Sequence, residues 1–396
     1  MFIILAITLA AMFLLTRQKY GVSQGMYRIC FMLGGAALVG IAAVPNPWLQ
    51  ALLVLMLFNL LRDSDVGVHL SRALPLFLMM ASAVILTDRL GTSLVYPGLV
   101  LMVGAGLILA VQTVLDYRRQ LAPSWMTPSL ASGQENVNNT QAISVICTSA
   151  ALGLAWGFSL QWLLAVPFTA LPILLIQWMD WRRNRSVTLG PPILAGVGLL
   201  TLPFFVGWWA SLTLLVAIPA LIWGIGEAYR KPVFWDSGRV RIWTTMLLSF
   251  WWNGGWMVRL CGRGWQSWVV CNDMLLQIAK KTKRQAIVNV HTMMSDAHSE
   301  YVQVLFEHGF LGFVLLAGYL LTSLWRLGHG GPEAQAVYIL GAGWCGVAAV
   351  LHPATFYHQT LAPHPDNPND HYLYSIGNPA LLWLSFLIVC MVEVVK

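Results

Sequence analysis

Charged side chains are scarce in this sequence. Lys, Arg, Asp and Glu together make up 10% of its 396 residues, whereas a soluble protein carries about 25%. Hydrophobic residues make up 58%, against about 45–50% in soluble proteins. These departures exclude an ordinary soluble enzyme, a disordered tail and a nucleic-acid-binding domain. They are typical of a polytopic integral membrane protein.

Patterns that bind metals or cofactors are also missing. The six cysteines form no CxxC pair and accompany no regular histidine spacing, so we expect no zinc or haem site. We find no acidic pair that would hold a cation, and we expect neither a metal nor another cofactor. Cys261 and Cys271 share a polar segment and could pair if it faces an oxidising compartment.

Long apolar runs recur along the chain without an amphipathic period. Because a membrane-spanning helix needs about 20 apolar residues, we predict an all-α fold with about 12 transmembrane helices. The first run has no basic leader and no small-residue cleavage site, so we expect a retained helix there, not a signal peptide. The expected spans lie near 2–16, 27–44, 47–61, 73–87, 94–115, 141–157, 160–178, 190–206, 208–226, 304–326, 335–352 and 379–395.

One long segment interrupts this pattern. Residues 227–303 carry ten of the chain's 23 Lys and Arg residues, with five acidic residues among them. We therefore predict an N-terminal transmembrane bundle at 1–226, a long basic loop at 227–303 and C-terminal transmembrane helices at 304–396. Within the loop, the Trp-rich stretch from Trp243 to Trp256 predicts an interfacial helix, and residues 273–288 predict a second helix.

The orientation stays open at this stage. Nine helices before the loop place it outside when the N-terminus is inside, but several basic residues then also lie outside, against the positive-inside tendency. Either the helix count is wrong by one, or those residues bind an anionic substrate.

The most informative motif ends the loop and enters the tenth expected span. It runs from Ser295 to Gly312 and resembles the C-terminal motif of the O-antigen ligase and polymerase superfamily, roughly His-Asn-x-Tyr-Leu-Gln-x-Leu-x-Glu-x-Gly-x-x-Gly. Ser299 replaces the usual Asn. The matching residues are His298, Tyr301, Gln303, Leu305, Glu307, Gly309 and Gly312.

Further pieces are similar to that family's pattern, in the expected order along residues 130–350. Arg239 with Trp243 resembles its Arg-x-x-x-Trp, and Gly262-Arg263-Gly264 resembles its Gly-x-Gly. Asn184-Arg185-Ser186 is similar to its Ser-Arg-Gly, with Ser and Gly replaced. An Asn-rich entry to the sixth span resembles the family's own; it contains Gly133, Asn136, Asn138 and Asn139.

The resemblance implies a metal-independent membrane glycosyltransferase of the GT-C type, in the bacterial inner membrane with its active site facing the periplasm. The donor would be an undecaprenyl-diphosphate-linked glycan, and we expect inverting transfer. A ligase transfers the glycan to lipid A–core, whereas a polymerase transfers it to another lipid-linked repeat. We expect a ligase because the large loop is basic and lipid A–core is phosphorylated; polymerase is the alternative.

The side chains suit that chemistry. A neutral hydroxyl is a poor nucleophile, and a histidine with a pKa near about 6.5 can take its proton, so we assign His298 as general base. Arginine binds phosphate oxygens bidentately, so we assign Arg185 and Arg239 to the diphosphate. Arg241, Arg259 and Arg263 could substitute for either of them. Tyr301 and Asn136 are expected to contact substrate on the strength of the motifs.

Helical spacing places Glu300 and Glu307 on one face, nearly opposite His298. If the helix is continuous from residue 298, neither glutamate orients the histidine directly. We then expect Glu307 to serve packing or to act on the site through another residue, and Gly309 and Gly312 to permit close helix contact. The competing class is transport, such as a flippase for lipid-linked glycans. Transporters typically have repeated halves and polar residues at mid-membrane; the sequence shows neither, which favours an enzyme.

Overall fold

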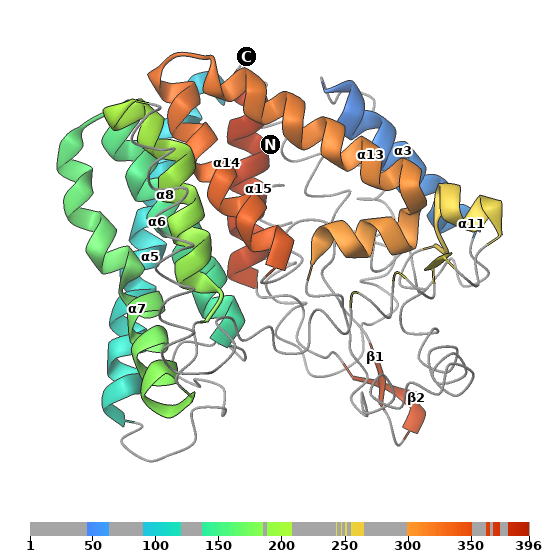
Figure 1. The fold of residues 1–396 in the computed structure, drawn as a ribbon, viewed down its shortest axis with the longest axis horizontal. Helices are drawn as coiled ribbons and strands as arrows, with labels where there is room; N and C mark the ends of the chain where they lie inside the picture. Colours follow the sequence, from blue (N-terminus) through green and yellow to red (C-terminus); the bar gives the residue numbers. More distant parts are fainter. Residues whose placement is uncertain are drawn as a thin grey trace. The chain divides into compact units, whose positions relative to one another are not determined.

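The computed structural model describes the chain in several stretches. They are residues 46–62, 90–119, 137–184, 188–207, 243, 247, 250–251, 255–264, 299–350, 362–364, 367–372 and 379–395. These stretches are predominantly helical (Figure 1), as the apolar runs predict. One short antiparallel hairpin, β1 (Ala362–His364) with β2 (Asn367–Tyr372), is the exception to the all-α expectation within them; it lies in a Pro-rich polar segment.

The helices coincide with eight of the expected spans. The other expected spans, near 2–16, 27–44, 73–87 and 208–226, lie outside the described residues, as does the expected helix at 273–288. The helices, with two short 3-10 turns, are α3 (Pro47–Arg62), η1 (Gly91–Leu94), α5 (Val95–Arg119), α6 (Val137–Gly157), η2 (Leu160–Ala165), α7 (Val166–Asn184), α8 (Gly190–Val206), α11 (Trp256–Cys261), α13 (Glu300–Gly328), α14 (Pro332–Val350) and α15 (Pro379–Val394).

Four helical segments within the described residues are long and apolar enough to cross a membrane. They are Gly91–Leu115, Thr140–Gly157, Leu160–Met179 and Glu300–Gly328. Length and composition of these helices identify a membrane protein, in agreement with the composition of the chain.

The chain forms two compact units. One comprises Met1–Arg89, Gly238–Thr322 and Pro353–Leu382; the other comprises Leu90–Ser237, Ser323–His352 and Trp383–Lys396. The sequence analysis divides the chain into three consecutive segments, at residues 226 and 303. The two compact units group segments in space, so they do not test that division, which stays a prediction.

In the unit that contains Leu90–Ser237, helix α6 packs against α5, α7, α8 and α14. Small residues allow these helices to approach closely: a Cβ at Gly153 would overlap the backbone of Ala336, and one at Gly106 would press on Cys147. Buried polar side chains bond to backbone. Gln141 accepts a hydrogen bond from the Gly190 amide at 2.7 Å. This bond satisfies one of the N–H groups at the start of α8 that have no partner within the helix.

In the other unit, α3 begins at a capping residue. The Asn46 side-chain oxygen accepts from the Trp48 amide at 3.0 Å, which is the usual way to satisfy the first N–H groups of a helix. The ring of Trp48 lies against Gly318 of α13, where a side chain would clash with it. Helices α3 and α13 therefore contact each other through a residue without a side chain.

Helix α13 consists of two arms. Gly309 has φ 71° and ψ −171°, which is not helical, so the first arm ends before it and the second continues to Gly328 (Figure 1). Gly312, in the second arm, lies next to Leu55 of α3. The expected close contact at these glycines is confirmed, but Gly309 also breaks the helix, which the spacing does not predict.

The expected interfacial helix from Trp243 to Trp256 is wrong at its C-terminal end. Trp243, Leu247, Phe250 and Trp251 are helical. Gly255, with φ −60° and ψ 171°, is extended, and Trp256 begins the separate helix α11. A ψ of 171° is not helical, so the segment that contains Gly255 does not form the single helix that the Trp-rich pattern predicts.

Candidate functional site

Two of the motifs that carry the family resemblance lie against each other in the structure. The Arg263 amide donates to the Phe306 carbonyl at 3.2 Å, and the Gly264 amide donates to the Glu307 carbonyl at 2.9 Å. These carbonyls lack helical partners because the first arm of α13 ends at Gly309. The loop Gly262–Gly264 thus closes the end of this arm.

Both glycines at this junction have backbone conformations that only glycine adopts readily. Gly262 has φ 82° and ψ −179°, and Gly309 has φ 71° and ψ −171°; other residues are rarely found there. A Cβ at Gly262 would overlap the Glu307 carbonyl, and one at Gly309 would overlap the backbone of Leu260 and Gly262. The two motifs fit together because each contributes a glycine at the point of contact.

Helix α3 secures this junction through Asn59, which is fully buried. The Asn59 side-chain nitrogen donates to the Cys261 carbonyl at 2.8 Å and lies 2.9 Å from Nδ1 of His308. Since the amide nitrogen is a donor, His308 Nδ1 accepts, which places the proton of the neutral ring on Nε2. One side chain thereby holds the end of α11 and the end of the first arm of α13.

Buried polar residues continue along the first arm. Gln303 and Glu307 are 2% and 0% exposed, and the Gln303 side-chain nitrogen donates to Glu307 Oε1 at 2.5 Å. A buried carboxylate is costly unless it accepts hydrogen bonds. The expected packing role of Glu307 is consistent with this position.

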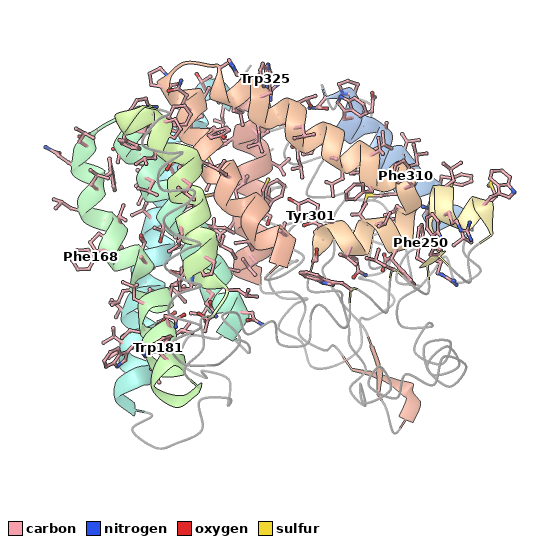
Figure 2. The ribbon with its side chains drawn as sticks, viewed as in Figure 1. Phe168, Trp181, Phe250, Tyr301, Phe310 and Trp325 are labelled. Atoms are coloured by element: carbon pink, nitrogen blue, oxygen red, sulfur yellow. The ribbon has the colours of Figure 1, made fainter. Side chains whose placement is uncertain are left out.

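The arm starts at Ser299, directly after His298. The Ser299 hydroxyl accepts from the Val302 amide at 3.5 Å, a long contact, and Ser299 is 2% exposed. The residue that replaces the family's usual Asn therefore sits at the N-cap of α13, where Asn and Ser are both favoured. Tyr301 is half-buried in the first turn (Figure 2).

Arg263 is half-buried and lies with its guanidinium carbon 5.7 Å from the centre of the Phe306 ring. Its main chain is fixed on both sides by the bonds of the loop to α13. A guanidinium binds phosphate oxygens through its planar fork of donors. Of the proposed phosphate ligands, the structure describes Arg263 and also Arg259, which is exposed on α11.

The remaining predicted residues lie outside the described stretches: His298, Arg185, Arg239, Arg241 and Asn136, together with Cys271. Cys261 has a free thiol. The structure therefore brings Arg263 to the α13 motif and leaves the positions of the others as predictions.

Sequence reasoning missed Asn59, whose side chain bonds to the Cys261 carbonyl and to His308. Asn59 is a polar residue within the apolar run at 47–61, and such residues inside membrane helices usually face a polar partner. The sequence therefore signals that Asn59 has a polar partner. It does not identify the partner, His308 of α13, because the two residues lie far apart along the chain.

Within the described stretches, no three or more His, Cys, Asp or Glu residues are grouped so that they could hold a metal ion. No protein-family model matches the chain, and a comparison with curated proteins finds no match either.

Proposed function

We propose that the chain is an integral membrane glycosyltransferase that moves a glycan from an undecaprenyl-diphosphate donor to lipid A–core at the periplasmic face. The observation that supports it is the junction between two motifs. Residues 262–264 and 299–312 resemble one family's pattern separately, and they meet through backbone hydrogen bonds between Arg263 and Phe306 and between Gly264 and Glu307.

The proposed reaction begins at the acceptor hydroxyl. His298 takes its proton as the oxygen attacks the anomeric carbon of the donor sugar. The bond from that carbon to the diphosphate oxygen breaks, and the diphosphate leaves with the negative charge. The attack inverts the configuration, and the leaving group needs charge stabilisation more than it needs a proton.

Arginines supply that stabilisation. Arg185 and Arg239 are the first candidates, and Arg241 and Arg263 complete the set. Arg263 is held on the arm that begins one residue after His298. Two backbone hydrogen bonds hold the main chain at Arg263, and a phosphate ligand held in place favours catalysis by orientation.

The test is transfer of a labelled undecaprenyl-diphosphate glycan by the purified protein, with and without lipid A–core. We expect wild type to label the core and His298→Ala to lose transfer by about 100-fold or more, as for removal of a general base. His329→Ala is the matched control, because His329 is exposed at the C-terminal end of α13 and should leave transfer unchanged.

Three results would contradict the proposal in different ways. Transfer by His298→Ala at the wild-type rate would remove the assignment of the base. Lengthening of the lipid-linked glycan without label on the core would identify a polymerase. Absence of transfer, with donor and acceptor shown to be competent by a known ligase, would favour a transporter of lipid-linked glycans.

A further inference from the structure

A large apolar groove lies beside the junction and has no part in the proposed chemistry. Its volume is about 890 Å³, within the range of roughly 300–1,000 Å³ that is typical of ligand sites. Among the residues that the structure describes, seven of those lining the groove are apolar and the eighth is Arg259. They are Leu247, Phe250, Trp251, Trp256, Arg259, Leu260, Leu305 and Phe310; Phe250 and Phe310 are labelled in Figure 2.

The apolar lining is largely uncovered. Trp251, Trp256 and Phe310 are 61%, 72% and 60% exposed. Large exposed apolar patches mark surfaces that bind a partner or a membrane. Two tryptophans beside an arginine are typical of the level of lipid headgroups, where aromatic rings lie between hydrocarbon and water.

Arg259 is the charged residue among the described residues that line the groove. Its Nη2 donates to the Trp251 carbonyl at 2.7 Å, and its guanidinium carbon lies 5.0 Å from the Trp251 ring centre. These contacts fix the side chain and use one of its five donors. Among the residues that the structure describes, no carboxylate forms an ion pair with Arg259, so an anion is the complementary ligand.

We propose that this groove binds an anionic phospholipid of the surrounding bilayer, with an acyl chain on the aromatic lining and the phosphate at Arg259. One guanidinium matches the single negative charge of a phosphodiester. A diphosphate carries more charge and calls for several cations, whereas the described part of the lining offers one. A zwitterionic headgroup brings its own ammonium next to an uncompensated arginine, so the site selects lipids with net negative charge.

The lipid would also support the neighbouring junction. Leu305 and Phe310 lie on either side of Gly309, and Leu260 precedes the Gly262–Gly264 loop. An acyl chain against these three residues covers apolar surface at the kink of α13. The proposal does not depend on the transferase activity.

The experiment is lipid binding to the full-length purified protein in detergent, measured by native mass spectrometry. The probes are phosphatidylglycerol, phosphatidylcholine with the same acyl chains, and undecaprenyl diphosphate. We expect phosphatidylglycerol to bind at least about tenfold more tightly than phosphatidylcholine. Both lipids carry a phosphate, but the choline ammonium of phosphatidylcholine offsets the attraction between that phosphate and Arg259.

Two variants locate the site. Arg259→Gln should weaken phosphatidylglycerol about tenfold and abolish the preference over phosphatidylcholine. Phe310→Ser should weaken both phospholipids by about fivefold, because it removes apolar contact. Phe168→Ser on α7 is the matched control: Phe168 is 58% exposed and lies outside the groove, so binding should stay at the wild-type level. Unchanged gel-filtration profiles establish that each variant is folded.

Other results would overturn the proposal. The first is that the two phospholipids bind with equal affinity. The second is that Arg259→Gln binds phosphatidylglycerol as tightly as wild type does. The third is that Phe168→Ser and Phe310→Ser change the affinity equally. Undecaprenyl diphosphate that displaces phosphatidylglycerol and is itself lost in Arg259→Gln would assign the groove to the glycan donor instead. Absence of binding by all three lipids would also refute it, and this result would leave the transfer assay unaffected.

Discussion

The contact between Gly262 and Gly309 makes a sharp prediction for Gly309→Ala. Two costs arise from adding one methyl group. The backbone at φ 71° and ψ −171° is nearly restricted to glycine, and another residue held there costs about 1–3 kcal/mol. The new Cβ also overlaps the backbone of Leu260 and Gly262, and overpacking of this kind costs about 1–3 kcal/mol.

Together these costs predict a destabilisation of about 2–6 kcal/mol, a large share of the roughly 5–15 kcal/mol that keeps a domain folded. The protein can reduce the cost by releasing the loop from α13. Release gives up the two bonds from Arg263 and Gly264 to the arm, each worth about 0.5–1.5 kcal/mol. In that case Arg263 loses its fixed position. The transfer rate then falls by more than the change in the free energy of unfolding would explain.

Thermal unfolding of the purified protein in detergent measures the effect, with two control variants that separate the two costs. Gly207→Ala changes a residue with φ 87° and nothing within 4 Å of the new Cβ, so it reports backbone strain alone. Gly104→Ala changes a residue of α5 that also has open space and has no unusual φ. It should be neutral or stabilise by up to about 1 kcal/mol.

The expected order of unfolding temperatures is Gly104→Ala highest, Gly207→Ala lower and Gly309→Ala lowest. If Gly309→Ala unfolds at the same temperature as Gly104→Ala, the kink and the docked loop are not features of the folded protein. If it matches Gly207→Ala, the contact with the loop contributes nothing and only the strain is real.

Three further substitutions test the junction. Asn59→Leu removes the donor to the buried His308 ring and to the part-buried Cys261 carbonyl. It should destabilise the protein by about 2–4 kcal/mol in the same unfolding assay. Asn46→Ala, which removes only the cap of α3, should cost about 1 kcal/mol, and equal effects would contradict the buried position of Asn59. Gln303→Leu removes a donor to buried Glu307 and should cost about 1–3 kcal/mol, so an unfolding temperature at or above that of wild type would argue against that hydrogen bond. Arg263→Lys keeps the charge but loses the planar fork, and the transfer assay should show a loss of at least about tenfold; full activity would exclude Arg263 as a phosphate ligand.

The positions of the helices could be predicted because they depend on local composition. An apolar run about 20 residues long has one stable state in a bilayer, a helix that satisfies its own backbone. The runs at 47–61, 141–157 and 190–206 accordingly coincide with α3, α6 and α8. Helix boundaries at single glycines were harder to predict from the sequence. The Trp-rich pattern predicts one helix, but Gly255 within it is not helical.

The candidate site divides in the same way. The motif after His298 and the Gly-Arg-Gly triplet could be recognised as residue patterns, and with them the type of chemistry they suit. That the triplet closes the end of the first arm of α13, and that Asn59 holds both, could not be predicted. These contacts join residues 202 and 249 positions apart, and no periodic pattern in a sequence encodes a pairing over such separations. They exist because a broken helix leaves carbonyl groups without partners, and burial requires that other segments supply the donors.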